Sequence, residues 1–136
     1  MSPAAMLGTP ADRALVTLGG TEVPAALTLT EPLPGLPGRT RYVLEPVAEA
    51  DGLFTLRSQD GPATRLFVVD PTHYFPGYEP EVPAEGERRL LVVVHPPTAD
   101  QPATANLLAP LVVDPAAATA QQTVLDADWP LRAPLT

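Results

Sequence analysis

The chain has 136 residues and no cysteine, and its 16 acidic residues outnumber its 8 basic ones, giving a formal net charge of −8. This length fits one domain, the lack of cysteine excludes disulfides and thiol chemistry, and the acidic charge argues against direct binding of nucleic acid. No apolar run is long enough to cross a bilayer and the N-terminus lacks a secretion signal, so we expect a cytoplasmic protein without a membrane partner.

The first residues are small and interrupted by proline, and we interpret residues 1–12 as a flexible tail before a single β domain over 13–136. Short apolar runs then alternate with Gly/Pro turns, and 19 prolines leave little room for long helices. This pattern predicts an all-β fold: a small antiparallel β-barrel or sandwich-like domain with at most one or two short helical turns. The expected strands are 25–30, 41–47, 53–58, 64–70, 88–95, 104–113 and 121–125.

Two of these strands, 64–70 and 88–95, are apolar at successive positions and not only at alternate ones. A strand with two apolar faces is typical of the covered middle of a domain. We therefore expect both segments to be buried on both sides, with 53–69 forming a hairpin around the turn at 59–62.

Residues 70–81, DPTHYFPGYEPE, hold three of the protein's seven aromatic residues in a loop interrupted by proline, with glutamates directly after them. One interpretation is that the rings plug the open end of a barrel. The other is that they form a rigid contact surface for a protein partner, because aromatic anchors on ordered loops often dominate binding energy. The candidates for partner binding in this loop are Tyr74, Phe75, Tyr78, Glu79 and Glu81.

The segment 104–113, TANLLAPLVV, reads as a strand with an embedded polar residue and an embedded proline. Pro110 has no amide hydrogen, so at that point the strand is expected at a sheet edge or a bulge. Asn106 is expected to satisfy backbone groups where the ladder is interrupted; the alternative is that it faces a partner at an exposed edge, which makes it a further binding candidate. One face of this strand is predicted to carry Ala105, Leu107, Ala109, Leu111 and Val113.

Helix signals are few. Asp114 and Pro115 suit the N-cap and first position of a helix of one or two turns.

Catalytic patterns are absent from the sequence. His73 and His95 have no His or Cys partner at the spacing of a metal site, and Asp70 reaches His73 only if the loop folds back. No strained-turn signature surrounds Ser58, and no glycine-rich phosphate loop precedes a helix. We expect no enzyme activity, no metal and no cofactor.

Four motifs in one order carry a family resemblance. TANLLAPLVVD followed by QQTVL resembles the T-A-N-L-x-A-P-I/L and Q-x-V-L segments of the flagellar assembly factor FliW family. GLPG (35–38), LRS (56–58) and LFVVDPTHYFPGYE (66–79) resemble the family's G-I/L-P-G, L-Q-S and F-x-V-x-x-P-x-x-F-F-x-D-Y-E motifs. The resemblance spans residues 13–125.

The resemblance implies a small β-barrel-like fold and a regulatory role without catalysis. Members of this family bind newly made flagellin, and when flagellin is exported they bind CsrA, an RNA-binding translational regulator, and relieve repression of the flagellin message. An acidic antagonist of a basic RNA-binding protein agrees with the charge of this chain. The alternatives are a flagellin-binding assembly module without CsrA regulation, or a small-ligand barrel with a polar pocket around His73 or His95.

The sequence departs from the family pattern in several places. Arg39 replaces an aromatic residue, Arg57 a glutamine and Gly77 an acidic residue, and Trp129 stands where the family has a tyrosine. The segment between Tyr78 and the next strand is also shorter than the helix-length insertion of the family, which puts the choice and strength of partner in question.

Overall fold

The structure is a computed structural model that describes residues 15–18, 21–33, 38–59, 64–80, 82 and 86–135. The predicted tail at 1–12 and the candidate Glu81 lie outside the described residues. The elements in chain order are β1 (Leu15–Leu18), β2 (Thr21–Pro24), β3 (Ala26–Leu29), β4 (Arg41–Pro46), β5 (Leu53–Ser58), β6 (Arg65–Val69), α2 (Pro71–Tyr74), β7 (Arg89–His95), β8 (Thr104–Ala105), β9 (Leu111–Asp114), β10 (Thr119–Gln122) and β11 (Ala133–Pro134).

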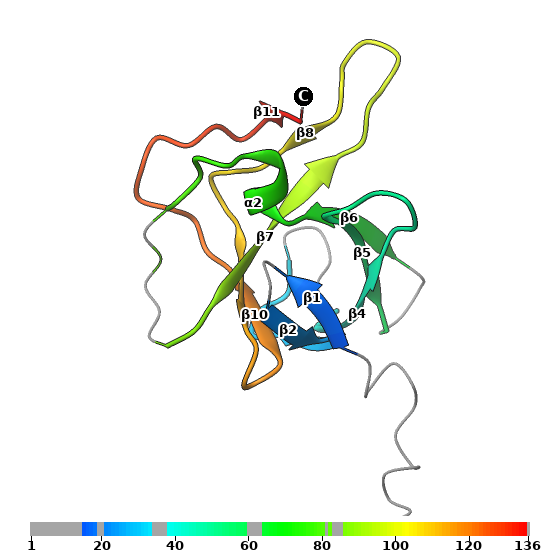
Figure 1. The fold of residues 1–136 in the computed structure, drawn as a ribbon, viewed down its shortest axis with the longest axis vertical. Coiled ribbons are helices and arrows are strands. Elements are labelled where there is room, and N and C mark those ends of the chain that lie inside the picture. The colour runs from blue at the N-terminus through cyan, green and yellow to red at the C-terminus, as the bar shows by residue number, and fades with distance from the viewer. Residues whose placement is uncertain are drawn as a thin grey trace, which may run out of the picture.

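Seven strands of the described chain close into a barrel in the order β7-β6-β5-β4-β3-β10-β9, because β9 pairs back onto β7. All neighbours in this ring are antiparallel except β10 and β3, which run parallel. The short strands β8 and β11 extend the sheet beyond the ring from the C-terminal half of β7 (Figure 1). The predicted all-β barrel with minimal helix is therefore confirmed.

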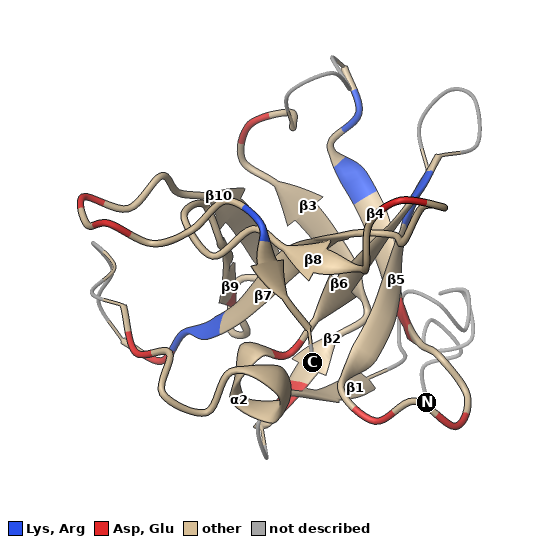
Figure 2. Cartoon of the chain, turned by 90° about the horizontal axis from the view of Figure 1, so that it is seen from above, with Lys and Arg blue, Asp and Glu red and all other residues tan. Residues whose placement is uncertain are grey.

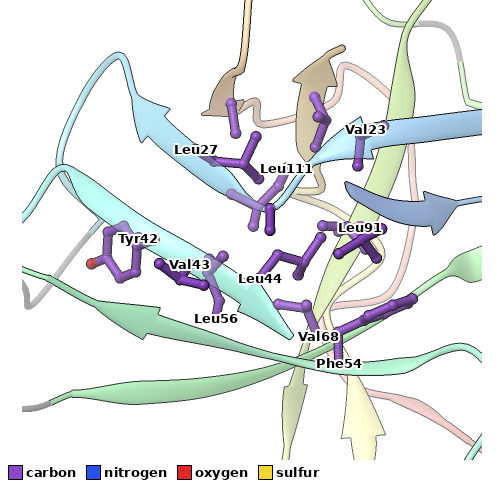
Figure 3. Close-up of a cluster of buried hydrophobic side chains, with 14 of the residues drawn as sticks. Val23, Leu27, Tyr42, Val43, Leu44, Phe54, Leu56, Val68, Leu91 and Leu111 are labelled. Carbon is purple, nitrogen blue, oxygen red and sulfur yellow. The ribbon is translucent and has the colours of Figure 1, made fainter. Parts of the chain in front are cut away.

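Two hydrophobic clusters share the strands of this barrel. The barrel core consists of Val16, Leu18, Val23, Ala25, Leu27, Leu29, Leu33, Tyr42, Val43, Leu44, Phe54, Leu56, Val68, Leu91, Leu111, Val113 and Ala120. Figure 3 shows labelled members of it converging from several strands. The outer cluster consists of Val69, Tyr78, Val92, Val94, Ala105, Leu107, Leu125 and Ala133.

The two clusters explain why β6 and β7 are apolar on both faces. Successive side chains of a strand point to opposite sides: in β7, Leu91 enters the barrel core whereas Val92 and Val94 enter the outer cluster. In β6, Val68 and Val69 divide in the same way. The prediction of covered strands over 64–70 and 88–95 is confirmed.

The prediction of one continuous strand over 104–113 is wrong. β8 and β9 both pair with the same edge of β7. Val94 faces Ala105 and Leu91 faces Leu111, so a step of three residues along β7 corresponds to a step of six residues along the chain from β8 to β9. The three additional residues are an odd number, and an odd offset moves the following side chains to the opposite face. The residues predicted to share a face are thus split: Ala105 lies in the outer cluster and Leu111 in the barrel core.

Other segments differ from the prediction locally. The last predicted strand, 121–125, is displaced to β10, and beyond it the Thr123 and Leu125 amides donate to the carbonyls of Pro110 (2.9 Å) and Leu108 (2.8 Å). The Asp114 side chain accepts backbone hydrogen bonds as an N-cap does, from the amides of Ala116 (3.0 Å) and Ala117 (3.2 Å). The turn stops there because Ala118 adopts a left-handed conformation (φ 58°).

Candidate functional site

The short helix α2 begins at a well-formed cap. Asp70 Oδ1 accepts from the Thr72 amide (3.0 Å) and from the Thr72 hydroxyl (2.7 Å), and Pro71 occupies the first turn, where its missing N–H costs nothing. The helix ends at Phe75, whose amide donates to the Pro71 carbonyl at 2.7 Å. Residues 70–75 therefore have a fixed backbone where the sequence indicated only a loop.

The rings of this segment are held to different degrees. Tyr78 is buried; its hydroxyl donates to the Leu107 carbonyl at 2.6 Å, and its ring makes an edge-on contact with Trp129 at 4.7 Å between centroids. Burial raises the pKa of Tyr78 to about 12, because ionisation would place a charge among apolar side chains. Tyr74 and Phe75 are half-buried, and the Tyr74 hydroxyl donates to the Asp51 carbonyl at 3.2 Å.

Between this segment and the C-terminal segment lies a concave surface of ≈ 420 Å³, which we call the aromatic groove. The described C-terminal residues are tied down beside it, since the Leu107 amide donates to the Pro130 carbonyl at 3.0 Å and β11 pairs with β8. The groove is lined by Tyr74, Phe75, Pro76, Gly77, Tyr78, Leu107, Trp129, Pro134 and Leu135.

Acidic residues flank the aromatic groove. Glu79 follows the lining residue Tyr78, Asp126 and Asp128 precede the lining residue Trp129, and all three are exposed. None of the three carboxylates forms an ion pair within the described part of the chain. Acidic residues lie mainly in loops and turns around the barrel (Figure 2), and these three are adjacent or close in sequence to lining residues of the groove.

Asn106 lies beside the groove and has a structural role. Its Oδ1 accepts from the amides of Leu108 (3.0 Å) and Ala109 (3.1 Å), in the turn that separates β8 from β9. The expectation that Asn106 satisfies backbone groups where the ladder is interrupted is confirmed. Pro110 is buried at the end of this turn, where the ladder is broken.

The structure brings together most of the predicted binding residues and adds others. Tyr78 is buried, but in the outer cluster and not in the barrel core, so it does not plug the barrel as one interpretation expected. The half-buried Tyr74 and Phe75 still present surface to the groove. Sequence reasoning missed Leu107 and Trp129 as lining residues. The sequence marked Trp129 only as the sole tryptophan and as the residue at a tyrosine position of the FliW pattern.

Of the residues considered for catalysis, only Asp70 and His73 come together: both line a hollow of ≈ 320 Å³, where Asp70 caps α2 and His73 is exposed on that helix. Ser58 lies in β5, and His95 ends β7. Across the described ranges, no group of three or more His, Cys, Asp or Glu side chains is arranged to hold a metal ion. A helix with the length and hydrophobicity of a membrane span is also not found there.

Comparison with known proteins assigns the chain to a family. A family model described as FliW protein matches residues 16–135. The chain belongs to the FliW family. A FliW relative named flagellar assembly factor FliW, from Heliobacterium modesticaldum, is 32% identical over 120 residues, covering 79% of this chain and 78% of the relative. Another, flagellar assembly factor FliW 2 from Desulfotalea psychrophila, is 32% identical over 106 residues, covering 71% and 70%.

The fold is that of FliW as well. A crystal structure of the flagellar assembly factor FliW superposes with a TM-score of 0.69 at 21% identity, covering 90% of this chain and 97% of the other. The departures from the FliW pattern have local explanations in two cases. Arg57 pairs with Glu45 on the neighbouring strand (3.3 Å), and Trp129 packs on Tyr78.

Proposed function

We propose that this chain is a flagellar assembly factor that acts through protein–protein binding: it binds flagellin in the cytoplasm and antagonises a CsrA-type RNA-binding regulator. The two partners couple the flagellin level to flagellin translation. While flagellin is present it occupies the protein, and once flagellin is exported the freed protein binds CsrA and relieves repression of the flagellin message.

The observation that carries this proposal is the aromatic groove with its acidic flanks, in a chain of the FliW family. Half-buried aromatic rings on a fixed backbone lose little entropy on binding, which suits Tyr74 and Phe75 as anchors. Exposed carboxylates such as Glu79 attract a basic partner and speed its association. CsrA must bind RNA and therefore carries a basic surface.

Asn106 contributes to this proposal indirectly. Its side chain fixes the turn that carries Leu107 into the groove, so it positions a lining residue. Glu81 belongs to the same acidic stretch in the sequence and is proposed as a steering charge together with Glu79.

The test is binding of the purified full chain to purified flagellin and, separately, to purified CsrA by isothermal titration calorimetry. We expect saturable binding to each partner, and flagellin added to the complex with CsrA should displace CsrA. Binding of flagellin alone would favour the second candidate, an assembly module without CsrA regulation, which the shortened 79–87 segment makes a specific alternative. Binding of neither partner would overturn both.

A further inference from the structure

The outer edge of β1 has backbone groups that no strand covers within the described chain. Leu15 faces Pro24 in the β1–β2 ladder, and proline has no N–H to exchange, so this pair is not a hydrogen-bonded one. Hydrogen-bonded pairs alternate along an antiparallel ladder. The N–H and C=O groups of Val16 and Leu18 therefore point toward β2, and those of Leu15 and Thr17 point away from it. Among the described residues, no backbone hydrogen bond reaches these outward groups.

Among the described residues, this edge has no charge, proline or bulge to protect it. Edge strands in natural proteins are blunted by charged side chains, proline or bulges. β1 has the sequence LVTL, without charge or proline, and its ladder with β2 is regular over all four residues. Val16 and Leu18 anchor the strand in the barrel core, whereas Leu15 is 57% exposed. An uncharged strand whose outward backbone groups have no partner among the described residues is suited to adding another strand.

The charges around β1 indicate what kind of strand fits. Thr17 lines a hollow of ≈ 320 Å³ together with Asp51 and Asp70, and no arginine lines it. On the other side, Thr17 faces the exposed Glu22 in the ladder. The Asp70 carboxylate is engaged with Thr72. Asp51 and Glu22 are thus two exposed carboxylates beside Thr17.

We propose that the outer edge of β1 binds an extended segment of a basic partner by strand addition, with a cationic side chain of that segment beside Thr17. Backbone bonds to Leu15 and Thr17 hold the added strand, and Asp51 and Glu22 select its charge. A second copy of this chain fits less well, because it would bring the same carboxylates against each other. This surface is distinct from the aromatic groove, although α2 contributes to both: Thr72 and His73 line the hollow at β1, and Tyr74 and Phe75 line the groove.

The probe is a blocked octapeptide of alternating Thr and Val with one central Lys, compared with the same peptide carrying Glu instead. Each is titrated into the full chain and followed by the amide NMR signals of Leu15 and Thr17 and by fluorescence anisotropy. We expect the Lys peptide to bind and to shift these amides, and the Glu peptide to bind at least about tenfold more weakly.

The deciding variant is Thr17→Pro, which removes the outward N–H and leaves the inward bonds of β1 in place. Its matched control is Thr17→Val, which keeps the N–H and the branched shape. We expect Thr17→Pro to weaken the Lys peptide at least about tenfold and Thr17→Val to leave its affinity unchanged. The double variant Glu22→Gln with Asp51→Asn should remove the discrimination between the two peptides, and this test remains available should the proline variant fail to fold.

Three results overturn the proposal: equal affinity of Thr17→Pro and the parent chain, no saturable binding of the Lys peptide, or unchanged charge discrimination in the double variant. The proposal is also overturned if the parent chain is a dimer in solution and Thr17→Pro is a monomer, because the edge of β1 then binds a second copy of the chain. The two proposals fail separately. If Thr17→Pro still binds flagellin and CsrA, the proposed function stands, and the affinity for the Lys peptide alone decides whether the edge of β1 binds an added strand.

Discussion

The hydroxyl of Tyr78 donates a 2.6 Å hydrogen bond to the backbone carbonyl of Leu107. Tyr78 lies in the segment after α2 and Leu107 in the turn between β8 and β9, so the bond ties two lining residues of the aromatic groove together. A buried carbonyl that loses its donor is costly, which makes this contact a direct test of how the groove is held.

Tyr78→Phe keeps the ring and its contact with Trp129 but removes the hydrogen bond. We expect the free energy of unfolding to fall by about 1–2 kcal/mol, because the Leu107 carbonyl is left without this partner. Urea denaturation at pH 7 measures the change, and an unchanged midpoint would show that the bond contributes nothing.

The same variant tests the raised pKa of Tyr78. The folded pKa is about 12, whereas the unfolded chain ionises its tyrosines near 10. Above pH 10 the unfolded state loses this proton first, so the stability that burial supplies is complete below pH 10 and is lost as the pH rises toward 12. The parent chain should lose on the order of 2 kcal/mol more than Tyr78→Phe between these limits. Parallel losses in both proteins would contradict the raised pKa.

Leu107→Asp should unfold the domain at room temperature. Leu107 is 4% exposed in the outer cluster, and burying an unpaired carboxylate costs several kcal/mol, which is comparable with total stability. Leu131→Asp is the matched control, because Leu131 is 56% exposed and should change stability by less than about 0.5 kcal/mol. Thermal melts followed by circular dichroism separate the two, and similar melts for both would show that Leu107 is not part of a core.

Asn106→Ala should destabilise the turn between β8 and β9. It removes the acceptor for two backbone amides, those of Leu108 and Ala109, and the expected loss is about 1–3 kcal/mol. Asn106→Asp keeps an oxygen at that position and should retain most of the stability at pH 7. Equal losses in the two variants would mean that the hydrogen bonds are not what Asn106 contributes.

Phe75→Ala tests whether the half-buried ring is an anchor for the proposed partner. As an anchor, its removal should raise the dissociation rate and cost about 2 kcal/mol or more of binding energy. As packing for the outer cluster only, its removal should lower the melting temperature and leave the affinity of the folded protein unchanged. Surface plasmon resonance with CsrA or flagellin, run beside thermal melts, distinguishes these outcomes.

Glu79→Gln tests electrostatic steering at the groove. Loss of an exposed charge next to the binding surface should slow association and flatten its salt dependence, with little effect on dissociation. Glu31→Gln, which removes an exposed glutamate after β3, is the control and should change the rate less. Identical association rates for both variants across salt concentrations would exclude a specific role of Glu79.

The sequence predicted the barrel because its strands have strong local signals. Within β6 and β7, residues 66–69 and 90–94 are uninterrupted apolar runs, and such runs indicate strands that are covered on both faces. The strands β1, β2 and β11 were not predicted, since each has four residues or fewer and such short runs carry little periodicity. Closure through the parallel pairing of β10 with β3 joins distant segments and leaves no mark in a local pattern.

The candidate site was predicted only in part for a similar reason. The cluster at Tyr74, Phe75 and Tyr78 is visible as a local concentration of rings, but the burial of Tyr78 depends on Trp129 and Leu107, which come from other parts of the chain. The helix α2 was missed because it is a single capped turn between Asp70 and Phe75, and a turn this short does not need a longer helical sequence.

The odd offset in the turn from Asn106 to Pro110 limits how this protein can change in length. Surface loops ordinarily tolerate insertions and deletions. With β8 held in place, deleting one residue here would turn Leu111 and Val113 outward and bring the Asp114 carboxylate, now paired with Arg88 at 3.4 Å, into the barrel core. Amino-acid replacements in this turn leave the number of residues odd. A single-residue insertion or deletion makes it even and moves every side chain of β9, the strand that closes the barrel, to the opposite face. Length variation at this turn should therefore survive in evolution only in steps of two.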